Sequence, residues 1–282
     1  NVYGGFVCRR MGIPYLPTIT GLGSTFQKSG PLLFLVERMY YEGLKKASCV
    51  FFQNEENRQI FRRGGLVSGR DRLVPGAGVN TKVWQAMPYP KDEVTNFLFV
   101  GRVMKEKGIE EFFRAAEVLH SEKVVFSICG YCDEDYQEEL DERASRGEIL
   151  QLGFHPDMHE YYRDCSAVVM PTWHEGMSNV LMEASACARP VIASNISGCR
   201  EIFEDGVTGY GFAPHSPEEL IRTLHHFLTL DRSQRAAMGE AARQKMIEEF
   251  DREKVAAAYL EEIHAAMEEP KEDGGKKGNS ET

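Results

Sequence analysis

Between residues 97 and 230 the sequence alternates short, uninterrupted apolar runs with longer amphipathic segments. Strands are expected at residues 97–100, 124–129, 149–152, 167–170 and 191–193, and helices at 108–120, 135–146, 179–188 and 217–230. Strands that are apolar on both faces and alternate with helices belong to a parallel sheet covered on both sides. The pattern therefore predicts a Rossmann-like α/β domain over residues 95–250.

A shorter alternation of the same kind comes first. Strands are expected at residues 15–20 and 49–53 with a helix at 31–47 between them, and Asn54 is a favourable N-cap for a helix that ends at Arg63. Residues 74–90 are rich in Pro and Gly and lack periodicity, which is typical of a linker. Because 282 residues suit two domains, we expect a first domain at 1–75 and a linker at 76–94.

The two ends of the sequence differ from its body. The chain starts at Asn1 instead of methionine and a Tyr-Gly-Gly turn is expected next, so we expect the chain to begin inside a fold, with its first domain incomplete. A helix is expected at residues 251–267. Residues 268–282 are mostly Lys, Glu, Gly and Ser, and we predict that they are disordered because they offer little apolar surface to bury.

The composition indicates the cellular compartment of the protein and excludes some classes of protein. No apolar stretch approaches the roughly 18 residues of a transmembrane helix, and no signal-peptide pattern is present. Seven cysteines, an odd number, suit reduced thiols better than a disulfide framework. The sequence therefore predicts a soluble cytoplasmic protein.

The charge is unevenly distributed. Residues 1–72 hold 11 Lys and Arg against 5 Asp and Glu, whereas the remaining residues hold 22 against 38. No nucleic-acid recognition motif accompanies the basic residues, so we expect no nucleic-acid partner. An anionic membrane surface, a phosphorylated acceptor or a simply solvated face would each explain them. The helix expected at 31–47 is amphipathic, which suits either core packing or peripheral membrane contact.

Two segments that follow expected strands contain side chains that could bind a ligand. In a doubly wound sheet the ligand lies beyond the carboxyl ends of the strands. After the strand at 97–100, Arg102 and Lys107 flank the start of a helix, a pattern that suits a diphosphate and equally an exposed basic loop. After the strand at 167–170, Glu175 and Glu183 could each accept hydroxyl hydrogen bonds from a sugar and a ribose, or could be solvated charges.

The ordered motifs resemble glycosyltransferase family 4. They are Gly101-Arg102 to Lys107-Gly108, the Glu175 to Glu183 spacing, Arg189-Pro190-Val191, and Gly198-Cys199-Arg200-Glu201-Ile202 before Asp205-Gly206. Residues 19–23 and 51–54 are similar to bacterial members that build surface glycans on a polyprenyl diphosphate. The resemblance implies a GT-B fold of two Rossmann-like domains with parallel sheets, the first incomplete here. It also implies sugar transfer with retention of anomeric configuration, and a final helix that crosses back onto the first domain.

The same resemblance implies roles for individual residues. Arg102, Lys107 and Glu175 would be the catalytic residues, because they hold the leaving diphosphate and the transferred sugar. The remaining donor-binding residues would be Gly101, Gly153, Phe154, Gly176, Met177, Ser178, Asn179 and Glu183, with Glu183 on the ribose and Gly153 and Phe154 beside the base. Thr20, Gly21 and Gly23 would lie on the acceptor side. Many relatives have a histidine where this chain has Thr20, and the family's opening glycine-rich loop is absent.

The implied partners are a nucleotide-sugar, with UDP as the expected nucleotide, and an acceptor that is a glycan or is linked to a polyprenyl diphosphate. No cofactor and no metal ion are expected. Transfer to a lipid-linked acceptor would place the protein in the cytoplasm, with peripheral contact at the inner face of the membrane.

Four other sequence features bear on alternative functions. Cys129 and Cys132 have the spacing of a thiol oxidoreductase, but they end a strand and precede acidic residues, which disfavours a reactive thiolate. A nicotinamide-dependent dehydrogenase would share the sheet, yet no G-x-G-x-x-G follows any expected strand. The acidic run at 133–135 could bind a metal, but is better explained as complementing the dipole of the helix that it begins. His155 and His159 are interpreted as a surface pair.

Overall fold

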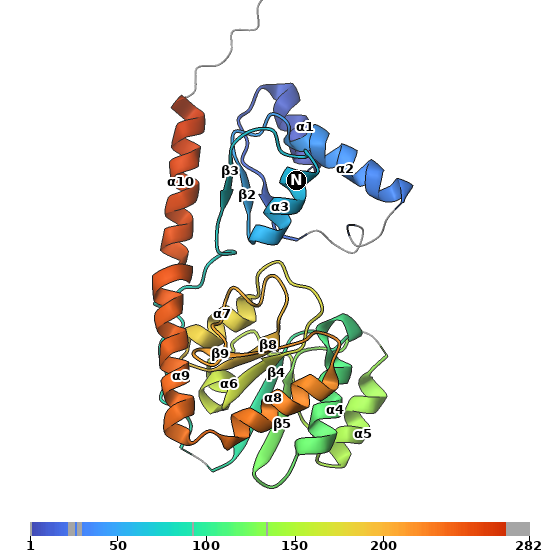
Figure 1. The fold of residues 1–282 in the computed structure, drawn as a ribbon, viewed down its shortest axis with the longest axis vertical. Helices are drawn as coiled ribbons and strands as arrows, with labels where there is room; N and C mark the ends of the chain where they lie inside the picture. Colours follow the sequence, from blue (N-terminus) through green and yellow to red (C-terminus); the bar gives the residue numbers. More distant parts are fainter. Residues whose placement is uncertain (1, 22–25, 27–29, 92, 134, 269–282) are drawn as a thin grey trace, which may run out of the picture.

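The computed structural model describes residues 2–21, 26, 30–91, 93–133 and 135–268. These residues form a smaller N-terminal lobe and a larger C-terminal lobe, each built on a parallel sheet (Figure 1). The site predicted from the sequence lies where the two lobes meet. The tail expected to be disordered falls, after Glu268, outside the described residues.

Within the described residues the C-terminal lobe has a six-stranded parallel sheet in the order β6-β5-β4-β7-β8-β9. Its strands are β4 (Thr95–Val100), β5 (Val124–Cys129), β6 (Leu150–Gly153), β7 (Ala167–Met170), β8 (Val191–Ser194) and β9 (Gly209–Phe212). The first five match the strands expected from the sequence. The sixth was missed because Gly209-Tyr210-Gly211-Phe212 lacks the β-branched run that marks the others.

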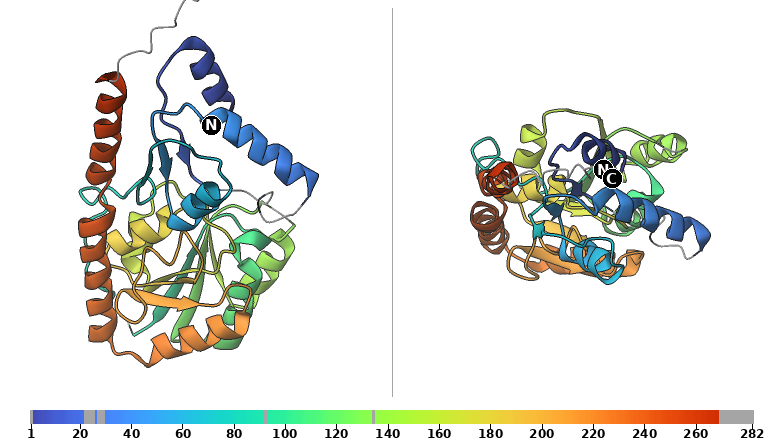
Figure 2. Two further views of the ribbon diagram at one scale, coloured as in Figure 1. Left: turned by 45° about the horizontal axis from the view of Figure 1, so that its top comes forward. Right: turned by 90° about the horizontal axis from the view of Figure 1, so that it is seen from above.

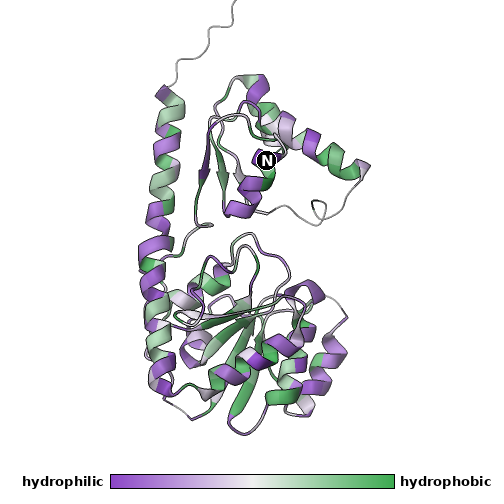
Figure 3. Ribbon diagram, in the orientation of Figure 1, coloured by the Kyte–Doolittle hydropathy of each residue, from purple (hydrophilic) through white to green (hydrophobic). Residues whose placement is uncertain are grey.

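Helices cover both faces of this sheet. They are α4 (Ile109–Leu119), α5 (Gln137–Ser145), α6 (His159–Asp164), α7 (Asn179–Ala186), α8 (Pro217–Thr229) and α9 (Arg232–Lys245). One apolar cluster joins the sheet to α4 and α8 through residues such as Phe112 and Phe227, and another joins it to α6 and α7 through Tyr162 and Leu181. Figure 3 shows the strands as hydrophobic and the outer helices as mixed. The sequence missed α6, which is short, and α9, which is mostly polar.

The N-terminal lobe is smaller. Its described strands β1 (Thr18–Ile19), β2 (Val50–Phe52) and β3 (Asp71–Leu73) are parallel and lie in that order. Its helices are α1 (Val2–Met11), α2 (Pro31–Leu44) and α3 (Glu55–Arg63). The expected turn at the start was wrong, because residues 2–11 form α1. Gly5 of α1 and Gly43 of α2 let the two helices approach, since a Cβ on Gly5 would overlap the Gly43 carbonyl.

A column of helices runs beside both lobes. It contains α9, a π-helical turn at Met246–Phe250 and α10 (Arg252–Glu268), and Figures 1 and 2 show α10 alongside the N-terminal lobe. The Tyr259 hydroxyl of α10 lies 2.7 Å from Thr18 Oγ1, and its ring lies 4.0 Å from that of Phe51, centroid to centroid. Arg72 reaches Glu261 at 2.6 Å. The last helix is therefore part of the N-terminal lobe's surface.

Arg189 holds in place the segment that connects the lobes, and its side chain is the largest fully buried one among the described residues. Arg189 is 0% exposed, and the hydrogen bonds of its guanidinium within the described part of the chain go to main-chain carbonyls. They belong to Met87 and Pro88 of the connecting segment, and to Tyr162, Arg163, Cys187 and Ala188 at the ends of α6 and α7. Arg189 thus ties the connecting segment to the C-terminal lobe.

None of the helices in the described part of the chain combines the length and apolar character that crossing a membrane requires.

Candidate active site

The order of the larger sheet identifies where a ligand would bind. From β4 the chain adds β5 and β6 on one side, and then returns to add β7, β8 and β9 on the other. β4 and β7 are therefore the neighbours at which the winding reverses, and a crevice forms beyond their carboxyl ends. The segments that leave these two strands are residues 101–108 and 171–179, the two in which the sequence placed the catalytic residues.

Lys107 and Glu175 meet in this crevice. Lys107 Nζ lies 2.5 Å from Glu175 Oε1, and the side chains are 23% and 16% exposed. The two segments pack backbone against backbone, since Gly108, at φ 75°, lies so close to Pro171 that a Cβ would overlap its carbonyl. Trp173 N also donates to Glu106 O at 2.9 Å. Two residues 68 positions apart thus form one charged pair.

Arg102 has a different partner from the one expected. Its Nη1 donates to Asp133 Oδ2 at 2.5 Å, and the side chains are 46% and 38% exposed. Asp133 was interpreted as part of an acidic run that begins a helix, but α5 begins later, at Gln137. That interpretation was wrong for Asp133, whose carboxylate neutralises the guanidinium predicted to bind phosphate. Gly101 precedes Arg102 at φ 153°.

The segment after Glu175 is held from both lobes. Ser178 caps α7 by accepting from Leu181 N at 3.4 Å, and Ser178 N donates to Gly198 O at 2.9 Å. Gly176 lies directly against the N-terminal lobe, because a Cβ there would overlap the carbonyl oxygen of Thr20. Met177 is buried, and Asn179 is the exposed first residue of α7.

Glu183 lies in a less polar setting than Glu175. The Tyr162 hydroxyl donates to Glu183 Oε2 at 3.3 Å, and burial raises the pKa of the Glu183 carboxyl. Burial raises the pKa of Tyr162 well above its ordinary value. Deprotonation of this carboxyl strengthens its acceptance of ribose hydroxyls, because a carboxylate is a stronger acceptor than the neutral acid and can accept through both oxygens.

His155 and His159 are half-buried, so the surface-pair interpretation was incomplete. The ring of His159 stacks on Trp84 with 4.2 Å between centroids, and its Nδ1 lies 2.5 Å from Asp157 Oδ1. That hydrogen bond raises the pKa of His159. His155 packs beside Tyr161 at 4.6 Å. Among the described residues no group of three or more His, Cys, Asp or Glu side chains could hold a metal ion.

The predicted base-binding residues lie at the end of β6. Gly153 has φ 76° and its carbonyl accepts from Gly130 N at 2.9 Å. Phe154 is exposed and meets the exposed Tyr131 edge to face at 6.0 Å. Sequence reasoning missed Tyr131, although its place directly after β5 satisfies the rule that ligand-binding residues follow strands.

The two cysteines proposed for a thiol oxidoreductase do not form a reactive pair. Cys129 is buried at the end of β5, where its thiol contacts Met158 Sδ at 3.4 Å, and burial raises its pKa. Cys132 is half-buried, and both are free thiols. A raised pKa opposes the thiolate that such an enzyme needs.

A cavity of about 670 Å³ opens between the lobes. Its C-terminal wall contains Trp173, Glu175 and Gly176, and its N-terminal wall contains Gly21 and Asn57. Thr20 is exposed at the end of β1. Gly23, the third predicted acceptor-side residue, lies outside the described residues. The cavity places Glu175 where it could contact groups held by either lobe.

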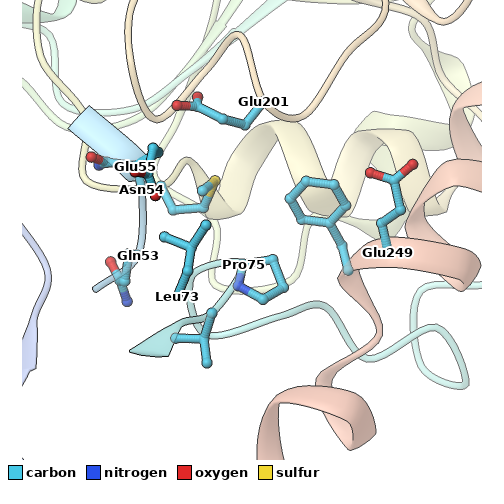
Figure 4. Close-up of a pocket in the computed structure, with 10 residues that line it drawn as sticks. Gln53, Asn54, Glu55, Leu73, Pro75, Glu201 and Glu249 are labelled. Atoms are coloured by element: carbon cyan, nitrogen blue, oxygen red, sulfur yellow. The ribbon is translucent and has the colours of Figure 1, made fainter. Parts of the chain in front are cut away.

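A second cavity of about 280 Å³ lies next to Met177. Figure 4 shows Asn54 and Glu55 from the N-terminal lobe on one side and Glu249 on the other, with Pro75 between them. Sequence reasoning assigned Asn54 to a helix cap and to the family-like segment 51–54, without a role in the site; its position after β2 was the signal that it also lines this cavity.

Comparison with known proteins identifies the family. The model for the family "Glycosyl transferases group 1" matches residues 85–245, more than half of the chain. A Campylobacter jejuni protein named N,N'-diacetylbacillosaminyl-diphospho-undecaprenol alpha-1,3-N-acetylgalactosaminyltransferase is 25% identical over 279 residues, covering 92% of this chain and 73% of that protein. The D-inositol 3-phosphate glycosyltransferase of Paenarthrobacter aurescens is 28% identical over 182 residues, covering 61% of this chain and 44% of its own length.

Solved structures share the fold. Anabaena HepE in complex with UDP superimposes with a TM-score of 0.79 at 20% identity, covering 94% of this chain and 76% of that one. Sucrose-phosphate synthase from Thermosynechococcus elongatus gives a TM-score of 0.77 at 22% identity, covering 94% and 72%. The expected GT-B fold is confirmed, and the dehydrogenase and thiol oxidoreductase alternatives find no support. With a transferase family matched across the loops that hold Lys107 and Glu175, the chain belongs to the group 1 glycosyl transferases.

Proposed function

We propose that this protein is a retaining glycosyltransferase that moves a sugar from a nucleoside-diphosphate sugar, with UDP as the nucleotide, to a hydroxyl of a lipid-linked or polysaccharide acceptor. The observation that carries the proposal is the Lys107–Glu175 pair at the reversal point of the larger sheet, in which Glu175 lines the cavity between the lobes. A cation and a carboxylate side by side suit the two halves of such a donor, its diphosphate and its sugar hydroxyls.

The charged side chains of the site are placed to stabilise the charges that develop during the reaction. Breaking the anomeric bond leaves an oxocarbenium-like sugar and an anionic diphosphate, so preorganised positive charge on the leaving group gives the largest stabilisation. Lys107 and Arg102 supply that charge. In the structure these cations pair with Glu175 and Asp133. Binding of a diphosphate would release Glu175 to accept hydrogen bonds from the sugar.

The retaining course needs no nucleophile from the protein if the acceptor hydroxyl attacks from the face that the diphosphate leaves. The same argument makes a metal ion and a cofactor unnecessary in this proposal, because side-chain cations carry the leaving-group charge. Glu183 would bind the ribose, and Gly153 and Phe154 would border the base, with the exposed ring of Tyr131 beside them.

A lipid-linked acceptor is supported by the Campylobacter jejuni relative, whose name specifies a diphospho-undecaprenol substrate. Exposed apolar side chains on α1 and α2 give the N-terminal lobe a surface for peripheral contact with the inner face of the cytoplasmic membrane. They are Tyr3, Val7, Met11, Leu32, Phe34 and Leu35. Arg10 is exposed on α1, and Arg38 on α2 is 62% exposed although it pairs with Glu42; both suit anionic lipid.

The test is transfer of labelled sugar from a panel of nucleotide-sugars to a polyprenyl-diphosphate glycan, followed by assignment of the product's anomeric configuration. We expect transfer from a UDP-linked donor, with retention. An inverted product would contradict the mechanism, and transfer of hydride instead of sugar would contradict the reaction class.

Calorimetry of UDP binding tests the donor site separately. Lys107→Ala and Arg102→Ala should each weaken binding by about tenfold or more, the scale of a lost charge-assisted hydrogen bond. Asp133→Asn is the matched control. Because it removes the anion that competes for Arg102, UDP should bind as tightly or more tightly, and a loss as large as that of Arg102→Ala would contradict this assignment.

A further inference from the structure

The side chain of Asn54 makes one hydrogen bond inside its own lobe and one across to the other lobe. Asn54 follows β2 and caps α3, where its Oδ1 accepts from Asn57 N at 2.9 Å. Its Nδ2 donates to the carbonyl of Gly176 at 2.8 Å. The residue is 2% exposed. Both ends of the amide are therefore used, and the second bond reaches the segment that carries Glu175.

Gly176 is a point at which the two lobes pack backbone against backbone. The carbonyl of Thr20, at the end of β1, occupies the space that a Cβ on Gly176 would need, and the Gln53 side chain lies beside it. On the other side, Gly198 is close to the carbonyls of Glu175 and Gly176, and its own carbonyl accepts from Ser178 N. The donor segment is thus held between the N-terminal lobe and the segment after β8.

A second contact between the lobes is weaker. Arg200 Nη2 lies 3.0 Å from Glu56 Oε2, but the side chains are 49% and 56% exposed. Exposed ion pairs contribute little because solvent screens them. The buried amide of Asn54 is the better candidate for transmitting the position of the N-terminal lobe to the site.

The choice of residue at position 54 supports this argument. Asn, Asp and Ser are about equally good helix caps, so capping alone does not require an amide. Asp offers an oxygen for the cap but no hydrogen for the Gly176 carbonyl, and its charge would repel that oxygen. Ser has a single, shorter hydroxyl. Of these three residues, Asn alone provides both an acceptor for the helix and a separate donor for the opposite lobe.

We infer that Asn54 is a positioning residue that couples the approach of the two lobes to the geometry of the donor-binding segment. Its bond to the Gly176 carbonyl fixes the plane of the Gly176–Met177 peptide, and thereby the segment that presents Glu175 to the sugar. The inference rests on the proposed function for its catalytic consequence. The link between the lobes itself depends only on the contacts described above.

Hydrogen–deuterium exchange of the unliganded protein tests the link without requiring turnover. Asn54→Ser keeps a capping oxygen without adding a charge, so its melting temperature should stay near that of the wild type, while exchange at residues 175–181 rises. Asn54→Asp should show the same rise in exchange, but its melting temperature should fall because its carboxylate would be buried beside the Gly176 carbonyl. Asn54→Ala should show the same rise and melt at a lower temperature. Asp231→Ala, which removes the cap of α9 far from the site, should lower the melting temperature without changing exchange at 175–181.

Kinetics tests the consequence. With the preferred nucleotide-sugar, Asn54→Asp should lower kcat about tenfold, the scale of one lost hydrogen bond, whereas Asp231→Ala should leave kcat unchanged. Unchanged exchange at 175–181 in Asn54→Asp, or a kcat that follows melting temperature across all four variants, would overturn the inference. If the wild type transfers no sugar from any donor, the proposed function fails, and the exchange result still decides whether Asn54 links the lobes.

Discussion

At the scale of single residues, the two cations predicted to bind phosphate are each held by a carboxylate. Lys107 pairs with Glu175 and Arg102 with Asp133. A bound diphosphate could take the place of the carboxylate in each pair, so that Lys107 and Arg102 would remain paired with an anion. The more enclosed pair, Lys107–Glu175, is the one whose glutamate lines the cavity between the lobes, so its rearrangement should have the greater consequence for the reacting sugar.

The two glutamates of the donor site should differ in kinetics. Glu175→Gln should reduce kcat by roughly 10² to 10³, the scale for removing one preorganised electrostatic contact to the transition state. Glu183→Gln should mainly raise the KM for the donor, because ribose is remote from the bond that breaks. Steady-state kinetics with a single donor separates these effects. Equal changes confined to KM in both variants would show that the assigned roles are wrong.

The raised pKa of Glu183 predicts a pH-dependent effect on stability. Burial raises the pKa in the folded state above its unfolded value, so the protonated carboxyl favours folding below about pH 4.3, the ordinary glutamate value. That contribution is lost as the pH rises through the raised pKa. Glu183→Gln should therefore be more stable than the wild type at pH 8, with a difference that shrinks towards pH 4.

Urea unfolding across this pH range measures the effect, and Glu240→Gln, at an exposed position on α9, serves as the control. A stability difference for Glu183→Gln that does not change with pH would show that Glu183 is not destabilised by burial.

At the scale of elements, the ends of α6 and α7 are joined to the segment between the lobes by one side chain. Arg189 donates to carbonyls at both helix ends and to Met87 and Pro88. Helix ends leave carbonyls without partners inside the helix. A buried guanidinium with several donors satisfies them together, which explains why a cation without a carboxylate partner in the described structure is tolerated in the interior.

Removing this cation should be costly. Arg189→Met fills a similar volume but leaves several buried carbonyls unsatisfied, so unfolding free energy should fall by about 3 kcal/mol or more. Chemical denaturation measures the loss. Arg222→Met on α8, where the arginine is largely exposed, should change stability by less than about 0.5 kcal/mol. Similar stabilities for the two variants would contradict the structural role of Arg189.

At the scale of the whole molecule, the site depends on both lobes and on side-chain charge. If Lys107 and Arg102 carry the charge of the leaving group, sugar transfer should persist in the presence of a chelator, and Asp135→Asn should retain most of the activity. The measurement is the rate with and without EDTA. A strict requirement for manganese or magnesium, lost in Asp135→Asn, would contradict the proposed mechanism.

The exposed apolar residues of α1 and α2 predict binding to vesicles that contain anionic lipid. Figure 2 shows α2 projecting from the N-terminal lobe. Binding should weaken as salt rises, because charges are screened over about 8 Å at physiological ionic strength, and Phe34→Asp should weaken it several-fold. Leu260→Asp, at an exposed apolar position on α10, is the control. Co-sedimentation that is absent at every salt concentration would remove the proposed membrane contact.

The local sequence pattern alone predicted most strands of the larger sheet. The continuous apolar strands predicted β4, β5, β6, β7 and β8, and the residues that follow β4 and β7 included the Lys107 and Glu175 that meet in the structure. Such strands are predictable because both faces of a parallel sheet are buried, which requires an uninterrupted run of apolar residues in the sequence. The weakly patterned elements, β9 and α9, were missed because Gly-rich and polar sequences fit their positions only once neighbouring elements are present.

The partners of the site's charges and amides were decided by tertiary structure. Asp133 lies 31 residues from Arg102, and Asn54 lies 122 residues from Gly176. Nothing in the local sequence distinguishes an aspartate that begins a helix from one that neutralises an arginine, or a capping amide from one that also reaches another lobe. The sequence by itself determined the strongly patterned strands and helices and which of their ends carry polar groups. Packing of strand ends from two sheets decided which of those groups meet, because hydrogen bonds and ion pairs depend on distances that only the assembled lobes define.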